Sequence, residues 1–384
     1  MNDNAKKLVP LSQVCTLNMG QSPSSDSYNE NKDGLPFFQG NADFGDLYPT
    51  ERIWCNQPSK IAHKGDILLS VRAPIGALNL AKEECCIGRG LAALSPIPSQ
   101  CRLMYLYYAL KSKVKILEQQ GTGSTFKAVG KDKISALQIP LYGLEEQERI
   151  ISELMSIDKG IDNLHKQLAK LDTLVKSRFV EMFGNPVTNP MGWEKVTLGN
   201  LSLKANNGMS RRGNDADGNI VLRLVELQSG MIDYSAPNRI KLTDTEMKRY
   251  QLRDKDFLFA RVNGNPENVG RCAVFREIAE PVFHNDHIIR YHFDEERING
   301  TFLSILMNSP YGKNKLTPQI KTSAGQYTVS QSGIDVIEIP LPSIALQSQF
   351  ADFVAQADKS KLVIRKLLEK QELLRAKLMQ EYFG

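Results

Sequence analysis

The sequence has no run of 18 or more apolar residues, the length that a membrane-spanning helix needs. Its opening residues, Met1 to Lys7, lack the apolar stretch of a secretory signal. The six cysteines include no CxxC pair, which argues against a disulfide framework or a zinc site and favours reduced thiols. We therefore expect a cytoplasmic protein without a membrane partner or a bound metal.

The chain also lacks the short motifs that mark common catalytic sites. It has no Walker loop and no convincing glycine-rich cofactor loop after a strand. Residues 308–311 (NSPY) resemble the base-holding tetrapeptide of amino-methyltransferases, but serine stands at its second position. Residues 243–246 (TDTE) form a helix-start signature rather than a nuclease site. His284, His287 and His292 have no cysteine or carboxylate at ligand spacing. We expect no catalytic residue and no cofactor on this chain.

The overall composition is ordinary for a globular protein. Of 384 residues, 41% are apolar and 24% are charged. This length allows two or three domains with proper cores. The formal net charge of +5 permits nucleic-acid binding without requiring it.

A long segment of the chain is repeated at a distance of 200 residues. Residues 137–141 (LQIPL) recur as 337–341 (IEIPL), and residues 181–184 (EMFG) recur as 381–384 (EYFG). Because the register does not slip between these anchors, the segment is duplicated rather than coincidentally similar. Two equivalent units in pseudo-twofold relation suit a target that itself has two halves.

Each repeat is expected to contain a long helix. Apolar residues in the first follow a 4-3 spacing at Ile150, Leu154, Ile157, Ile161, Leu164, Leu168, Leu171 and Val175. This spacing predicts a coiled-coil seam, which needs a partner helix. The second helix, about 343–383, carries Phe350, Val354, Ala357, Ile364, Leu368, Leu374 and Leu378, with Lys361 and Gln371 interrupting the seam. The two helices are each other's obvious partner in an antiparallel coiled coil.

The segments before the helices have short alternating strands and turns, with a helix expected near residues 103–117 in the first. A linker rich in Pro, Gly and Asn stops the first long helix. The predicted class is α+β, with two mixed α/β heads that are each followed by a long helix. The expected order is a head at 1–142, a helix at 143–184, a linker at 185–192, a head at 193–341 and a helix at 342–384.

This order, together with the strings SVRAPIG, IGRGLAAL, GTGSTFKAV and FHNDHIIR, resembles the specificity subunit of type I restriction-modification enzymes. The resemblance covers essentially the whole chain. It implies that each head is a target recognition domain reading half of a bipartite double-stranded DNA site. It also implies that the helices set the gap between the halves and dock two adenine-N6 methyltransferase subunits, through which restriction and translocase subunits join. Chemistry, with S-adenosylmethionine, ATP and Mg, would belong to those partners.

One predicted loop combines groups suited to DNA contact. Residues 121–127 (GTGSTFK) offer backbone N–H groups, hydroxyls, a ring and a cation for phosphates and base edges. Their repeat partner, residues 322–327, keeps the small residues and the ring but has Tyr327 where the first loop has Lys127. Reading two different half-sequences requires such divergence on matching scaffolds. The full set of candidate DNA-binding residues is Gln39, Asn41, Arg72, Arg89, Gly123, Ser124, Thr125, Lys127, Arg211, Arg212, Arg223, Arg261, Asn263, Asn265, Arg271, Asn285, His287, Gln326 and Tyr327.

Two alternatives remain open at this point. The chain could be a self-contained DNA methyltransferase or nuclease with its own recognition domains, or a noncatalytic assembly scaffold that never touches DNA. Binding of S-adenosylmethionine by the chain alone distinguishes the first alternative. Salt-dependent DNA binding distinguishes the second.

Overall fold

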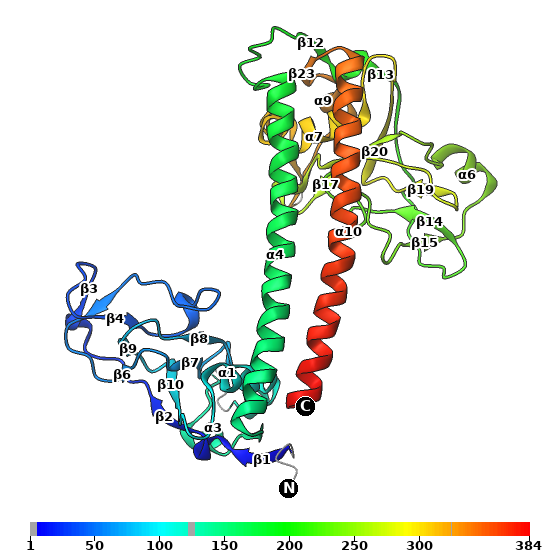
Figure 1. Cartoon of the computed structure of the whole chain (residues 1–384). Coiled ribbons are helices and arrows are strands. Elements are labelled where there is room, and N and C mark those ends of the chain that lie inside the picture. The colour runs from blue at the N-terminus through cyan, green and yellow to red at the C-terminus, as the bar shows by residue number, and fades with distance from the viewer. Residues whose placement is uncertain (1–5, 122–126, 324) are drawn as a thin grey trace. The chain divides into compact units, whose positions relative to one another are not determined.

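The computed structural model describes residues 6–121, 127–323 and 325–384 (Figure 1). The chain divides into two compact units, one formed by residues 1–166 with 365–384 and the other by residues 167–364. Each unit thus contains one head and parts of both long helices, while the head limits expected from the sequence remain a prediction. Within the described residues, no helix has the length and apolarity needed to cross a membrane.

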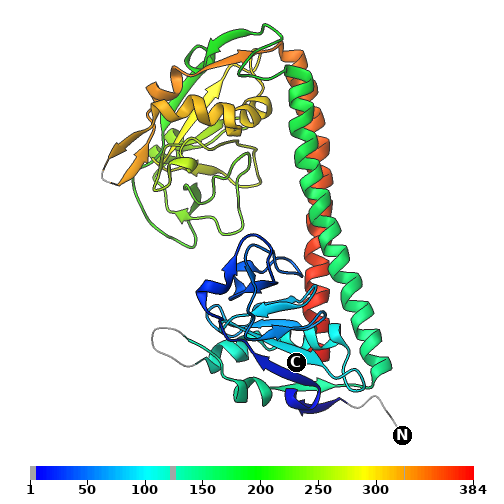
Figure 2. The ribbon, with the colours of Figure 1, turned by 90° about the vertical axis from the view of Figure 1, so that its left-hand side faces the viewer.

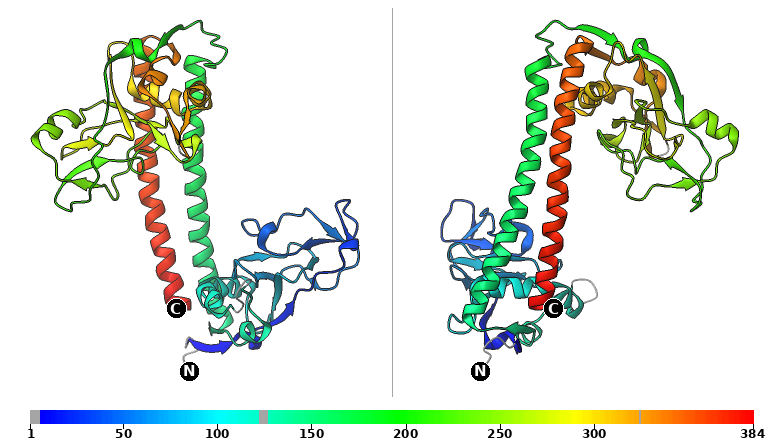
Figure 3. Two further views of the ribbon diagram at one scale, coloured as in Figure 1. Left: turned by 180° about the vertical axis from the view of Figure 1, so that it is seen from behind. Right: turned by 45° about the vertical axis from the view of Figure 1, so that its right-hand side comes forward.

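The first head contains two sheets. The four-stranded antiparallel sheet has the order β2 (Cys15–Met19), β10 (Leu91–Pro96), β7 (Ile67–Ser70) and β8 (Leu78–Leu80). The five-stranded sheet has the order β3 (Tyr28–Asn29), β5 (Trp54–Cys55), β4 (Leu35–Phe38), β9 (Cys85–Ile87) and β6 (Ile61–Ala62), with β4 and β9 parallel. Within this unit the four-stranded sheet lies between the long helices and the five-stranded sheet (Figure 3, left).

The second head repeats this plan. Its four-stranded sheet has the order β13 (Ser202–Asn207), β20 (Ile288–Phe293), β16 (Phe257–Ala260) and β18 (Cys272–Val274). A three-stranded sheet has the order β15 (Arg239–Ile240), β14 (Asn219–Leu222) and β19 (Val282–His284), with β14 and β19 parallel. A further sheet pairs β17 (Val262–Asn263) with the hairpin of β22 (Gln326–Thr328) and β21 (Lys321–Ser323).

Short helices cover the heads. They are α1 (Leu103–Ser112), α2 (Val114–Gln120) and α3 (Lys131–Ser135) in the first, and α5 (Leu198–Leu201), α6 (Asp244–Tyr250), α7 (Gly300–Asn308), α8 (Pro310–Leu316) and α9 (Gln331–Asp335) in the second. The single helix expected near residues 103–117 is therefore two helices, divided at Lys113. The N–H of Lys113 bonds the Leu110 carbonyl in a tight final turn, and its side chain binds the carbonyl oxygen of Phe383. Sequence alone does not reveal that distant partner.

The duplicated IPL strings form matching two-stranded sheets at the entry to each long helix. Strand β1 (Lys7–Pro10) pairs with β11 (Gln138–Leu141), and β12 (Glu194–Thr197) pairs with β23 (Glu338–Leu341). Val9 faces Ile139 in the first pair, and Val196 faces Ile339 in the second. All four side chains are buried, so the sequence repeat is also a repeat of structure.

The two long helices lie side by side, as the heptad spacing predicts (Figure 1). They are α4 (Leu144–Phe183) and α10 (Ile344–Phe383). In the first unit Arg375 Nε lies 2.6 Å from Asp158 Oδ1, and in the second Lys361 Nζ lies 2.8 Å from Asp172 Oδ1. In the first unit Tyr382 also bonds Glu153, and in the second Phe350 also contacts Phe183. Within each unit the contacts therefore advance along α10 as they go back along α4, so the pair is antiparallel. Gly184, with a φ of 75°, ends α4 in the left-handed conformation common after helices.

The seam of α10 differs in detail from the sequence expectation. Leu374 is 47% exposed and does not belong to the seam. The side chain of Lys361 is only 14% exposed, and Gln371 is half-buried against Gly160 of α4. The expected interruptions are thus seam positions occupied by polar residues. The next seam position is occupied by Arg375. Its ion pair with Asp158 of α4 compensates the cost of its partial burial.

Each unit's core contains the last turn of one long helix and the first turns of the other. In the first unit Ile150 and Leu154 of α4 are buried with Phe383 of α10. In the second unit Phe350 of α10 is buried with Phe183 of α4. The repeated Phe-Gly ends of the helices are therefore core elements.

A buried glutamine fixes the start of each long helix to its head. Gln147 is fully buried, and its Oε1 accepts from the backbone N–H of Arg102 at 2.8 Å. Its Nε2 donates to the carbonyl oxygens of Gln100 at 3.0 Å and Tyr142 at 2.8 Å. Gln347, also fully buried, makes the same three kinds of bond in the second unit, with Asn299, Arg297 and Pro342.

Replacing either glutamine by alanine should lower the free energy of unfolding by about 2–4 kcal/mol, because it leaves one buried donor and two buried acceptors without partners. Chemical denaturation of Gln147→Ala and Gln347→Ala measures the loss. Gln167→Ala, on an exposed face of α4, is the control and should change stability by less than about 0.5 kcal/mol. Equal behaviour of all three variants would contradict the proposed role of the buried amides.

Candidate nucleic-acid interface

Backbone hydrogen bonds bring three loops of the first head together. The N–H of Gly88 donates to the Phe38 carbonyl at 2.9 Å, and the N–H of Gly90 donates to that of Gln39 at 3.1 Å. The Gly90 carbonyl in turn accepts from the Val71 N–H at 2.9 Å. A Cβ at Gly90 would lie 2.5 Å from the Gln39 carbonyl oxygen, so this approach requires glycine. The loops after β4, before β10 and after β7 therefore form one edge.

The residues that directly follow the predicted phosphate-binding loop join the same edge. Arg72 forms an antiparallel bridge with Ala128, and the N–H of Val129 donates to the Val71 carbonyl at 2.9 Å. Lys127, directly before the bridge, is exposed. The remaining candidates of this loop, Gly123, Ser124 and Thr125, lie outside the described residues.

The second head repeats three of the four bonds of this framework, while the N–H of His287, at the position of Gly90, donates to Asn285 Oδ1 instead. The N–H of Asn285 donates to the Leu222 carbonyl at 3.0 Å, as that of Gly88 does to Phe38. The N–H of Arg261 donates to the His287 carbonyl at 2.7 Å, and the Arg261 carbonyl accepts from the Val329 N–H at 2.9 Å.

These bonds align the two heads position by position. Equivalent positions carry different side chains, namely Gln39 and Arg223, Val71 and Arg261, Arg89 and Asp286, Gly90 and His287, and Lys127 and Tyr327. Since the framework uses backbone groups, these side chains can change without loss of the connections that hold the loops together.

The edge of the first head is positively charged. Arg72, Arg89 and Lys127 are exposed, and none of them forms an ion pair within the described part of the chain. Gln39 is also exposed, whereas Asn41 is half-buried at the start of a short 3₁₀ turn (Asn41–Asp43). This edge offers charged and amide donors to a ligand that accepts hydrogen bonds.

The edge of the second head contains a carboxylate that sequence reasoning did not select. Asp286 Oδ1 lies 2.7 Å from Arg212 Nη2, which also lies 3.1 Å from His287 Nε2. Arg261 Nη1 donates to the Asp286 carbonyl at 3.3 Å, and Asn285 Oδ1 accepts from the His287 N–H at 3.1 Å. Burial lowers the pKa of His287, the two arginines lower it further, and Asp286 opposes them. The net shift favours the neutral imidazole.

The hairpin of β21 and β22 extends this edge, because β22 pairs with β17, the strand directly after Arg261 (Figure 2). Tyr327 pairs with Asn263 of β17, and Gln326 is exposed. Asn263 Oδ1 accepts from the Asn265 N–H at 2.9 Å, and Asn265 Oδ1 accepts from the Glu267 N–H at 3.0 Å. Both amide oxygens stabilise the loop, while their NH₂ groups remain donors.

Three candidate arginines form ion pairs or hydrogen bonds with other residues of the second head. Arg211 pairs with Glu246 at 2.8 Å, Arg223 pairs with Glu226 at 2.6 Å, and Arg271 donates to the Leu224 carbonyl. Glu246 also completes a capping box with Thr243, which confirms the predicted helix start. These arginines are less free to reorient toward a ligand than the exposed cations of the first head.

The tetrapeptide that resembles a methyltransferase motif has a structural role. Asn308 Oδ1 accepts from the Cys272 N–H at 3.1 Å, and its Nδ2 donates to the Cys272 carbonyl at 2.8 Å. Ser309 caps α8. Within the described residues there is no group of three or more His, Cys, Asp or Glu side chains suited to a metal ion.

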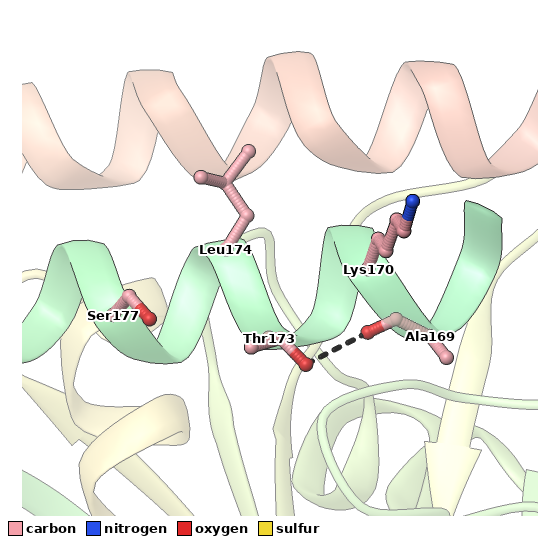
Figure 4. A pocket seen from close by; sticks show the side chains of 5 residues that line it. All are labelled: Ala169, Lys170, Thr173, Leu174 and Ser177. Atoms are coloured by element: carbon pink, nitrogen blue, oxygen red, sulfur yellow. Dashed lines mark hydrogen bonds between the residues drawn. The ribbon is translucent and has the colours of Figure 1, made fainter. Parts of the chain in front are cut away.

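A shallow depression lies on α4 in the second unit (Figure 4). It is lined by Ala169, Lys170, Thr173, Leu174 and Ser177. The Thr173 hydroxyl donates to the Ala169 carbonyl at 3.0 Å, and the Leu174 side chain points toward the neighbouring helix (Figure 4). Since Lys170 is the single ionisable group of this lining, the depression lacks the paired groups that acid-base chemistry needs.

The family model described as the type I restriction modification DNA specificity domain matches residues 4–173. The MjaX protein of Methanocaldococcus jannaschii, named a putative type I restriction enzyme specificity subunit, is 40% identical over 41% of this chain and 37% of its own length. The StySPI specificity subunit of Salmonella potsdam is 25% identical over 71% of this chain and 62% of its own length. The chain thus matches between about a third and two thirds of these relatives.

A solved structure extends the likeness in fold to the whole chain. The type I restriction-modification S subunit from M. genitalium matches 100% of this chain and 97% of its own, with a TM-score of 0.66 and 16% identity. The head-helix-head-helix fold class expected from the sequence is confirmed. By these matches the chain is similar to type I restriction-modification specificity subunits, the class that the family model and both relatives represent.

The buried histidine behind the second edge predicts a pH dependence of stability. His284 is fully buried, with Nδ1 3.1 Å from the Tyr250 carbonyl oxygen, and burial lowers its pKa to about 4. Because the unfolded chain, with a pKa of about 6.5, binds this proton more readily, stability present above pH 6.5 is lost as the pH falls toward 4. At pH 5 the loss should reach about 2 kcal/mol.

Denaturant unfolding at pH 7 and pH 5 tests this expectation. The wild type should lose about 2 kcal/mol more than His284→Gln, which has no titrating ring. His165→Gln removes an exposed histidine and should keep the wild-type pH dependence. An identical pH profile for His284→Gln and the wild type would show that this ring does not control acid stability.

Proposed function

We propose that this chain is the DNA-recognition subunit of a type I restriction-modification complex and reads a bipartite site, one half with each head. The observation that carries the proposal is the pair of equivalent loop edges with different side chains. A common framework with changed donors and acceptors is what recognition of two unlike half-sites requires. As a subunit acting on DNA, it would work in the cytoplasm.

The side chains at the two edges support this proposal. Arg72, Arg89 and Lys127 in the first head form an exposed cationic edge that suits phosphate contact. In the second head, Arg212 and Arg261 present guanidinium groups beside a neutral imidazole. Guanidinium groups can bind guanine edges in a bidentate manner, and amides can bind adenine edges.

We further propose that the two equivalent units dock two adenine-N6 methyltransferase subunits, through which restriction and translocase subunits would join. The chain itself would perform no chemistry, so S-adenosylmethionine, ATP and Mg would bind to those partners. The duplication of heads and long helices supports this stoichiometry, because equivalent surfaces can bind equivalent partners.

Measurements of DNA binding by variants should distinguish residues that contact phosphates from residues that read bases. Lys127→Ala should weaken binding to all sequences similarly and lower the salt slope by about one, because it removes a phosphate contact. Arg261→Ala should cost about 1–3 kcal/mol and relax preference at one base pair of the second half-site. Binding to every single-base variant of the site, measured at several salt concentrations, gives both quantities.

A control for these variants is Lys195→Ala, which removes an exposed cation from β12, away from either loop edge in sequence and pairing. It should leave both affinity and sequence preference unchanged. A uniform loss for Arg261→Ala would make Arg261 a phosphate contact. If the wild type shows no salt-dependent DNA binding, the proposed function is wrong, and a noncatalytic assembly scaffold that does not touch DNA is favoured.

Reconstitution with methyltransferase subunits should distinguish the recognition subunit from a self-contained enzyme. The chain alone should bind no S-adenosylmethionine in calorimetry, and methyl transfer should rise with added methyltransferase until two subunits are present per chain. Native mass spectrometry should show the same two-to-one complex. A stable equimolar complex contradicts the stoichiometry, and methyl transfer by the chain alone would establish the enzymatic alternative.

A further inference from the structure

A cationic pocket lies in the second head, outside the set of residues selected from the sequence. It has a volume of about 230 Å³. Its lining comes from β13, α6, the segment before β16, and β20, and consists of Lys204, Asn206, Lys248, Arg249, Gln251, Arg253 and Arg290. Five of these seven side chains are cations, and none is acidic.

The positive charge of this pocket is only partly neutralised by neighbouring acids. Lys204, Lys248, Arg249 and Arg253 are exposed, and none of them forms an ion pair within the part of the chain that the structure describes. The carboxylate of Asp256 is buried nearby and pairs with Arg290, the fifth cation of the lining, and with His292. Its Oδ2 lies 3.7 Å from the Nη1 of Arg290, and its Oδ1 lies 3.2 Å from the Nδ1 of His292.

Arg290 gives the pocket a buried donor. It is 7% exposed, and its Nη1 donates to the Gln251 carbonyl at 2.7 Å. Its Nε is buried without a hydrogen-bond partner among the described residues. A buried donor without an acceptor is costly, and a bound anion would supply the missing acceptor.

This arrangement is not required by the fold. The strand register places Asn206 opposite Arg290 in the second head and Asn18 opposite Ala93 in the first. Ala93 is fully buried in a sheet with the same strand pattern, so an arginine is not needed at this position. Lys248 and Arg249 lie in the last turn of α6, where cations stabilise the helix end, but Lys204 and Arg253 belong to other segments.

We propose that this pocket binds one backbone phosphate of DNA held by the second head. The assignment rests on the proposed function, and it adds a sequence-independent anchor to the loop edge that reads bases. A phosphodiester fits because its oxygens accept hydrogen bonds from lysine and arginine side chains and carry the opposite charge. Neutralising the phosphate releases counterions, so the contact contributes to the salt dependence of binding.

The test uses the full chain carrying Lys248→Gln and Arg253→Gln together, which removes two exposed cations from separate segments and leaves Arg290 in place. DNA affinity should fall about tenfold, the loss expected for a hydrogen bond to a charged group. The salt slope should fall by about 0.9, the value for one phosphate. Every single-base variant of the site should lose affinity to the same extent.

The matched control removes two exposed lysines of the second unit elsewhere, Lys195→Gln with Lys359→Gln, and should keep wild-type affinity and salt slope. Thermal melting establishes that both double variants are folded. A second pocket variant, Lys204→Gln, should weaken binding in the same sequence-independent way, whereas Lys248→Arg, which keeps the charge, should preserve it.

Four outcomes would overturn the assignment. If the pocket variants bind DNA like the wild type, the pocket is not an anchor, while the proposed function stands. A loss confined to one base pair would make the pocket a base-reading element. If inorganic phosphate raises the melting temperature of the wild type but not of the pocket variant, and DNA affinity is unchanged, the pocket is a site for free anions. If the wild type does not bind DNA, both proposals fall together.

Discussion

The structure depends on the exchange of helix ends between the two cores. The first core is completed by Phe383 of α10, and the second by Phe183 of α4. A head with the helix that follows it in sequence therefore lacks a large buried side chain, whose removal from a core typically costs about 3–5 kcal/mol. The duplication explains how this need is met, because each copy supplies the end that the other core requires. Gln147 and Gln347 then fix the starts of the same helices to the heads.

Sequence reasoning was most successful for the long helices because two independent signals coincide there. The 4-3 spacing from Ile150 to Val175 indicates a helix with a partner, and the repeat at 200 residues identifies the second helix even where polar residues weaken its pattern. The register of α10 was less accessible. Hydrophobicity favours Leu374 as a seam residue, yet Arg375 occupies the seam because a carboxylate of α4 pairs with it. That pairing depends on a residue more than 200 positions away.

The individual loops of each edge could be predicted from the sequence, but their association into one surface could not. Gln39, Arg72 and Arg89 are candidates because each lies on an expected loop, but their association depends on the parallel pairing of β4 with β9. Nothing local in the sequence indicates that pairing. Asp286 was overlooked because a carboxylate is not an expected DNA ligand, although its partner Arg212 was selected. The cationic pocket had no linear signal, since its residues extend from Lys204 to Arg290 in four segments.

In both heads, the groups that hold the loops together and the groups that differ between the heads are of different kinds. Backbone N–H and carbonyl groups hold the loops together, so side chains can differ between heads while the framework stays the same. Positions with close backbone approach, such as Gly90, are the exception, because a Cβ there meets a carbonyl oxygen at 2.5 Å. The equivalent residue in the second head is His287, whose N–H donates to Asn285 Oδ1 and makes no bond to the neighbouring loop like that of Gly90. Divergence at the edge therefore changes both the donors offered and one of the bonds that connect the loops.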